Sequence, residues 1–208
     1  MNKNNTISLK FIKYVVIIVA AVTIGIFLGK FITNYETRYL LNREYCGKYR
    51  GIEVYKSGTI NADNFIGHAH LLEAAPDVLV ECCDVMYFTG DDLNVPSVGG
   101  SFGKALGLTQ DGTIYISTSS FNIDVIYHEL FHAYDNKHDK ISESFEFLRI
   151  VDKERDKVFV ELHDEDMYAA EFFAAAGAQY LLEPEILKNA APETYDFIDK
   201  LINEDLTN

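Results

Sequence analysis

The stretch His128-Glu129-Leu130-Phe131-His132 places two histidines and a glutamate at a spacing that suits a metal site on a helix. Residues four apart share one helix face, so both imidazoles can bind the same ion while Glu129 lies beside it. Zn²⁺ accepts such ligands and lowers the pKa of a bound water toward neutrality, and a neighbouring carboxylate can then take the proton. The motif therefore predicts a zinc site with Glu129 as general base, and it leaves the third protein ligand open.

The surroundings of this motif favour a helix packed inside a domain over a solvated helix on which the pattern arose by chance. The preceding residues 113–117 alternate as a strand does, and Ser119 or Ser120 can cap the helix that follows. Apolar residues, Val125 and Ile126 among them, accompany the histidines, and the motif uses two of only six histidines in the chain. The context therefore supports a metal site.

Two residues compete to be the third ligand. His138 follows His132 by six residues, which is the spacing of metzincin peptidases, although Asp135 stands where that pattern has a glycine. Glu171 lies on a second predicted helix, and a glutamate from a separate helix completes the two-histidine, one-glutamate set of gluzincins. Spacing alone leaves both candidates open.

Four segments carry a resemblance to a known family, namely residues 106–109 (LGLT), 128–135 (HELFHAYD), 171–174 (EFFA) and 189–195 (NAAPETY). They resemble the catalytic domain of anthrax lethal factor and the related secreted clostridial Pro-Pro endopeptidases, over roughly residues 60–205. The resemblance implies a zincin-like fold with one zinc ion per chain, bound by His128, His132 and Glu171. It also implies that Glu129 is the general base, and that His138 is a surface residue.

The chain departs from the family pattern at three positions. Phe131 stands where the family usually has glycine, and Ala175 stands where it has a second glutamate. Asp164 takes the place of a tyrosine able to stabilise the oxyanion, and an ionised carboxylate cannot donate the hydrogen bond that this role needs. His163 and Tyr168 are the nearby substitutes. These departures support an alternative, a catalytically silent zinc-containing binding or regulatory module.

The charge of the chain is distributed unevenly along its 208 residues. Residues 1–50 carry eight lysines or arginines against two acids, whereas residues 51–208 carry ten against thirty, for a net charge of −14 overall. So acidic a body repels phosphate backbones, which excludes nucleic acid as the main partner and favours a protein or peptide substrate. The three cysteines, Cys46, Cys82 and Cys83, match no metal-binding spacing and leave the redox compartment open.

The N-terminal part contains an apolar run long enough to cross a bilayer. About twenty apolar residues span the hydrocarbon core, and the only charges of the run, Lys13 and Lys30, lie near its ends. No small-residue cleavage site follows it, so an uncleaved signal anchor is favoured over a signal peptide, with the catalytic body outside the cell. The predicted divisions are a basic tail (1–10), a transmembrane anchor (11–32), a polar stalk (33–50) and the zinc metallopeptidase domain (51–208).

The pattern of apolar residues and turn signals predicts an α+β fold, in which a small sheet precedes a helical C-terminal half. The expected elements are helices over 61–75, from the cap at Ser119 or Ser120 to Asp135-Asn136, over 167–182 and from 192 onward, strands at 85–88 and 113–117, a loop over 96–107 and a mixed helical segment over 142–160. Together with the metal-binding motif and the apolar N-terminal run, this α+β fold predicts a membrane-anchored zinc endopeptidase. The alternatives are the silent module and a metzincin-like peptidase that uses His138.

Overall fold

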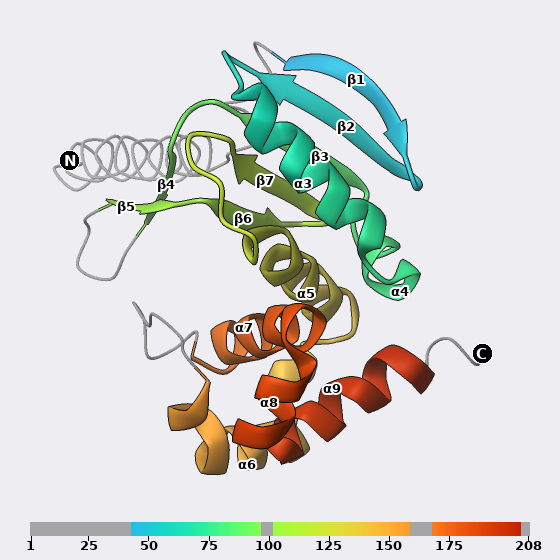
Figure 1. Ribbon diagram of the computed structural model, residues 1–208, viewed down its shortest axis with the longest axis vertical. Coiled ribbons are helices and arrows are strands. Elements are labelled where there is room, and N and C mark those ends of the chain that lie inside the picture. The colour runs from blue at the N-terminus through green and yellow to red at the C-terminus, as the bar shows by residue number, and fades with distance from the viewer. Residues whose placement is uncertain (1–42, 97–101, 159–167, 205–208) are drawn as a thin grey trace, which may run out of the picture. The chain divides into compact units, whose positions relative to one another are not determined.

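A mixed five-stranded sheet forms the first half of the fold (Figure 1). The structure is a computed structural model that describes residues 43–96, 102–158 and 168–204. The strands are Arg43–Tyr49 (β1), Ile52–Ser57 (β2), Val85–Thr89 (β3), Gly107–Gln110 (β6) and Thr113–Ser117 (β7), in the order β1–β2–β3–β7–β6. β3 is parallel to both β2 and β7, whereas β6 is antiparallel to β7 and forms an edge of the sheet.

Helices connect and cover the parallel strands. Helix Ala62–Ala74 (α3) begins at Asn61, whose side chain accepts a hydrogen bond from the Asn64 N–H, and the short helix Asp77–Val80 (α4) follows Pro76. Alternate strand residues point to opposite faces, and one set enters the apolar core beneath the helices. This core includes Ile52, Val54, Met86, Phe88, Ile114 and Ile116.

Four tyrosines form a ladder across neighbouring strands. Tyr55 and Tyr87 are partners in the β2–β3 register, and Tyr87 and Tyr115 are partners in the β3–β7 register. Their rings stack with centroids 5.1 Å and 5.3 Å apart, and Tyr45 of β1 extends the row at 5.2 Å from Tyr55. Offset aromatic pairs at these distances stabilise the strands that carry them.

The second half of the chain is helical. Its α-helices are Val125–Lys137 (α5), Phe145–Glu154 (α6), Tyr168–Leu182 (α7), Pro184–Ala190 (α8) and Pro192–Glu204 (α9), with 3-10 turns at Ile141–Glu143 and Arg155–Lys157. α5 packs against α7, and it also contacts β6 and β7, so it joins the sheet to the helical half (Figure 1). The described residues thus form an α+β fold with seven α-helices, as the sequence predicts.

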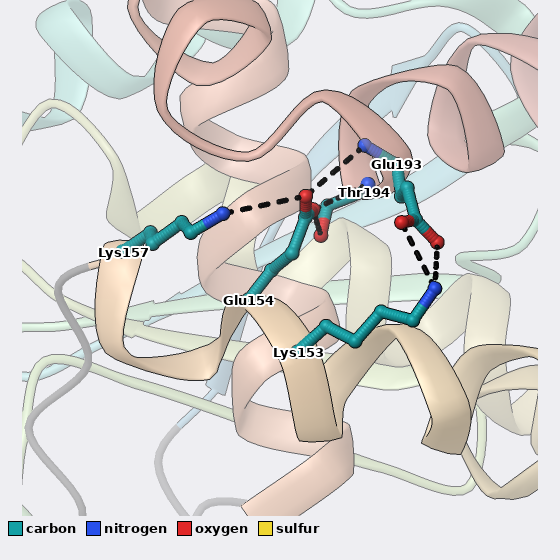
Figure 2. A network of polar contacts seen from close by, with 5 residues as sticks. All are labelled: Lys153, Glu154, Lys157, Glu193 and Thr194. Carbon is teal, nitrogen blue, oxygen red and sulfur yellow. Dashed lines mark hydrogen bonds and ion pairs between the residues drawn. The ribbon is translucent and has the colours of Figure 1, made fainter.

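A buried carboxylate fastens α6 to the start of α9 (Figure 2). Glu154 is 3% exposed and accepts hydrogen bonds from the Thr194 N–H at 2.9 Å, the Thr194 hydroxyl at 2.8 Å and the Glu193 N–H at 3.3 Å. On the surface beside it, Lys153 pairs with Glu193 at 2.9 Å. Helix N-termini present unpaired N–H donors, and Glu154 satisfies two of them from another helix.

Two predicted non-regular segments contain strands. Residues 43–49, expected at the end of the stalk, form β1, which is mostly exposed and so lacks the alternation that identifies a strand in sequence. Residues 102–105, expected in a loop, form Phe102–Ala105 (β5), which pairs antiparallel with Leu93–Pro96 (β4). Each strand depends on backbone pairing with a neighbour, which composition does not reveal.

The predicted N-terminal anchor is not among the described residues. The basic tail (1–10), the apolar run (11–32) and the first part of the stalk (33–42) all lie outside them. Within residues 43–96, 102–158 and 168–204, no helix combines the length and the hydropathy that a membrane crossing requires.

Candidate active site

The three predicted ligands come together between α5 and α7. His128 and His132 lie one turn apart on α5, and Glu171 lies in the first turn of α7. The two histidine Nε2 atoms are 3.0 Å apart, and the Glu171 carboxylate oxygens lie 3.2 Å from His128 Nε2 and 3.4 Å from His132 Nε2. Among the described residues, no other group of three His, Cys, Asp or Glu side chains converges closely enough to hold a metal ion.

The spacing of these donors fits a metal ion. In a tetrahedral zinc site with metal–ligand distances of about 2.0–2.1 Å, neighbouring ligand atoms lie about 3.3 Å apart. The three observed separations of 3.0, 3.2 and 3.4 Å lie close to that value. The donor set, two imidazoles and one carboxylate, is also one that zinc accepts, so the residues present fit the ion that the sequence predicts.

The electrostatics of the cluster favour a cation. Burial disfavours the charged form of His132, but its hydrogen bond to Glu171 and the nearby charges of Glu129 and Asp135 outweigh burial and raise the pKa of His132. Burial likewise disfavours ionised Glu171, but hydrogen bonds from both histidines lower the pKa of Glu171 well below its usual range. Glu171 is therefore an anion at neutral pH, the form that binds a metal.

Glu129 lies in the same pocket as His132 and Glu171. Its side chain is 5% exposed, and the Thr109 hydroxyl of β6 donates a hydrogen bond of 2.7 Å to Glu129 Oε2. A pocket of about 280 Å³ is lined by Glu129, His132 and Glu171 together with Leu108 and Thr109. This places a buried carboxylate beside the donor cluster, as a general base requires.

His138 lies apart from the cluster. α5 continues through Asp135 to Lys137 instead of turning there, and His138 forms its C-terminal cap with its ring stacked on Tyr134 at 4.2 Å. Asp135 is buried and accepts two hydrogen bonds of 2.7 Å from the N–H and the hydroxyl of Ser142. The structure thus assembles the set with Glu171 and does not assemble the metzincin-like set.

The unusual Phe131 is matched by a small residue on the facing helix. A Cβ atom placed on Gly177 of α7 would lie 2.4 Å from the Phe131 ring, so the ring occupies space that only glycine leaves open. Phe131 is fully buried and also meets Phe173 edge to face, with centroids 5.5 Å apart. The packing of α5 on α7 therefore accommodates Phe131 at a position where the family usually has glycine.

Of the other departures, Ala175 faces a separate pocket, which it shares with residues 122–124 and the end of α7. Asp164 and His163 lie outside the described residues, and Tyr168 is the first residue of α7. Gly107 and Thr109 of β6 carry no sequence signal of a role in the site, because β6 is only four residues long and shows no apolar alternation. Residues 107 and 109 are two apart, so their side chains would share one face of the sheet if this segment formed a strand.

Comparisons with known proteins identify a shared fold and a family. No curated protein matches the chain. Among solved structures, the Pro-Pro endopeptidase PPEP-2 from Paenibacillus alvei matches with a TM-score of 0.54 and 22% identity, over 71% of this chain and 96% of that one, which shows a shared fold. The model of the family described as "Anthrax toxin lethal factor, N- and C-terminal domain" matches residues 91–201, more than half of the chain and the part that contains all four site residues. The resemblance noted in the sequence is confirmed, and the chain belongs to the anthrax toxin lethal factor family.

Proposed function

We propose that this chain is a zinc-dependent endopeptidase. The observation that carries the proposal is the convergence of His128, His132 and Glu171 at metal-binding distances, with Glu129 in the pocket that His132 and Glu171 line. Membership of the lethal factor family and a fold shared with an endopeptidase support the reaction class.

The residues present divide the chemistry between them. His128, His132 and Glu171 would hold the zinc ion, which when bound supplies Lewis acidity toward a peptide carbonyl and toward water. Glu129 takes a proton from the attacking water on its carboxylate and passes it to the nitrogen of the departing amine. Because Glu129 is almost fully buried, bulk water does not compete for that proton.

The edge strand offers a place for the peptide. β6 ends the sheet, and Leu108 and Thr109 of this strand line the pocket that contains Glu129. An extended peptide can add to such an edge through backbone hydrogen bonds, which brings a scissile bond to the pocket. The acidic body favours substrates with basic residues near that bond. The solved structure that shares this fold is a Pro-Pro endopeptidase, so peptides that contain a Pro-Pro sequence are the first substrates to examine.

A peptide-library assay tests the reaction class. The full chain loaded with one equivalent of zinc is compared with Glu129→Gln, and products are identified by mass spectrometry while bound zinc is measured in both proteins. We expect cleavage by the wild type only, with equal zinc in both, because the substitution removes the base and leaves the ligands. Cleavage by Glu129→Gln would remove Glu129 from the mechanism. Zinc binding without cleavage by either protein would favour the silent binding module.

We further propose that residues 11–32 anchor the protein in a membrane with the catalytic domain outside the cell. Support comes from the sequence alone, from the length of the apolar run and its flanking lysines. External protease added to intact cells should degrade the domain, and deletion of residues 11–32 should release the protein from the membrane fraction. Protection of the domain in intact cells would reverse the orientation, and an unchanged distribution after the deletion would contradict the anchor.

A further inference from the structure

Two residues of the edge strand β6 contact Glu129, the proposed general base. Gly107 and Thr109 are two apart on β6, so they point to the same face of the sheet, the face that contacts α5. Both positions contact the side chain of Glu129. Thr109 offers a hydroxyl to the Glu129 carboxylate, and Gly107 leaves space for it.

The hydroxyl of Thr109 binds the carboxylate in preference to the helix backbone. Thr109 Oγ1 lies 2.7 Å from Glu129 Oε2 and 3.0 Å from the Glu129 carbonyl oxygen. A hydroxyl has one hydrogen to donate, and the shorter contact to the charged acceptor is the stronger bond. One carboxylate oxygen of Glu129 is therefore tied to β6.

Gly107 leaves the room that the carboxylate fills. A Cβ at this position would lie 2.4 Å from Glu129 Oε1 and 2.6 Å from Glu129 Cγ, distances that real atoms do not reach. The φ angle of Gly107 is not positive, so its backbone conformation suits any residue. The three atoms nearest to such a Cβ all belong to the Glu129 side chain, which accounts for glycine at this position.

We propose that Thr109 is a positioning residue whose hydroxyl orients the Glu129 carboxylate. Gly107 leaves open the space that this carboxylate occupies. The inference rests on the proposed function, because it concerns the base of that reaction. A glutamate has three side-chain torsions, and a bond from a sheet strand restricts where its carboxylate points. Small displacements of a reacting group, near 1 Å, cost up to about 100-fold in rate.

A purely structural bond between β6 and α5 would also explain the contact, and the chain contains a matched control for it. Thr194 donates its hydroxyl to the buried carboxylate of Glu154 at 2.8 Å, in the helical half of the fold (Figure 2). Thr→Val at either site removes the same bond from a glutamate of similar burial while it keeps the side-chain shape. Of these two threonines, Thr109 lines the pocket that contains His132 and Glu171, and Thr194 does not.

The test compares Thr109→Val, Thr109→Ser and Thr194→Val in the zinc-loaded full chain, with a peptide that the wild type cleaves. For Thr109→Val we expect kcat to fall about 10- to 100-fold with KM and zinc content unchanged, because the base is misplaced in a site that still binds substrate. Thr109→Ser restores the hydroxyl and should recover most of kcat. Thr194→Val should lower the thermal midpoint and leave kcat unchanged. Equal kcat values for the two valine variants would overturn the proposal.

A second measurement separates this inference from the proposed function. Crystal structures of the wild type, Thr109→Val and Thr109→Ser report the Glu129 side chain directly, whether or not a substrate is known. We expect one Glu129 conformer in the wild type and the serine variant, and a displaced or divided carboxylate in the valine variant. An undisplaced carboxylate in Thr109→Val would overturn the positioning role. An inactive wild type with a displaced Glu129 in that variant would refute the peptidase function and leave the positioning intact.

Discussion

Acidification should destabilise this protein through one buried histidine that lies outside the candidate active site. His68 of α3 is fully buried, and within the part of the chain that the structure describes neither ring nitrogen has a hydrogen-bond partner. Its neighbours from the sheet and from the segment before α5 are Phe88 and Phe121, with ring centroids at 6.3 Å and 4.9 Å. Phe121 reaches it across Gly67, where a side chain would collide with the ring. Burial lowers the pKa of His68 to about 4, and no bond to the charged form offsets this effect.

The sign and size of the effect follow from that pKa. The unfolded chain protonates His68 near its ordinary pKa of about 6.5, whereas the folded chain resists protonation down to about 4, so acid favours the unfolded state between those values. The contribution of His68 is complete above pH 6.5 and is lost as the pH falls toward 4. The difference of about 2.5 pKa units corresponds to a loss of up to about 3 kcal/mol, and to about 2 kcal/mol at pH 5. A typical domain has only about 5–15 kcal/mol of stability.

Urea unfolding of the full chain, followed by far-UV circular dichroism from pH 8 to pH 4.5, measures this loss. His68→Leu is the comparison, because it keeps an apolar side chain in the cavity and removes the titrating group. Both proteins are measured with a chelator so that release of metal from His128 and His132 does not enter the difference. The wild type should lose about 2 kcal/mol more than His68→Leu between pH 8 and pH 5. Parallel pH dependences in the two proteins would refute the reasoning.

Three further substitutions test the packing and the hydrogen bonds. Glu154→Ala leaves the N–H and hydroxyl donors of Thr194 without their buried acceptor, and thermal melts should show a loss of about 3 kcal/mol; an unchanged midpoint would show that water replaces the carboxylate. Gly177→Ala drives a Cβ into the Phe131 ring and should cost about 1–3 kcal/mol in urea unfolding, but much less in a Phe131→Ala background; equal costs in both would deny the contact. Asp135→Ala leaves the N–H and the hydroxyl of Ser142 without their buried acceptor and should cost about 1–3 kcal/mol by the same assay, so wild-type stability in this variant would contradict the bonding described.

The sequence predicted those parts of the fold in which local pattern and tertiary structure agree. The helix around His128 and the helix that carries Glu171 have regular apolar spacing, and both form close to the expected bounds. α5 ends at Lys137, just beyond the predicted stop at Asp135-Asn136, and the Asp135 side chain binds Ser142 instead of terminating the helix. The predicted cap at Ser119 or Ser120 is wrong. Asp124 occupies the N-cap and makes no side-chain capping bond.

The contacts that the sequence did not predict are those between segments far apart in the chain. Thr109 and Glu129 are twenty residues apart and meet only because β6 folds back beside β7. Phe131 looks like a departure that weakens the motif until Gly177, forty-six residues later, is seen to face it. A single sequence records each member of such a pair but not the distance between them in space.

The row formed by Tyr45, Tyr55, Tyr87 and Tyr115 provides a spectroscopic signal for the assembly of the sheet. The chain contains thirteen tyrosines and no tryptophan, so no stronger chromophore masks their near-ultraviolet signal. The rings of Tyr55, Tyr87 and Tyr115 stack, the Tyr45 ring is tilted against Tyr55, and the four rings share their transitions only while their strands stay paired in register. Near-ultraviolet dichroism therefore offers an unlabelled optical probe of tertiary order, which far-ultraviolet helix signals cannot separate from residual secondary structure.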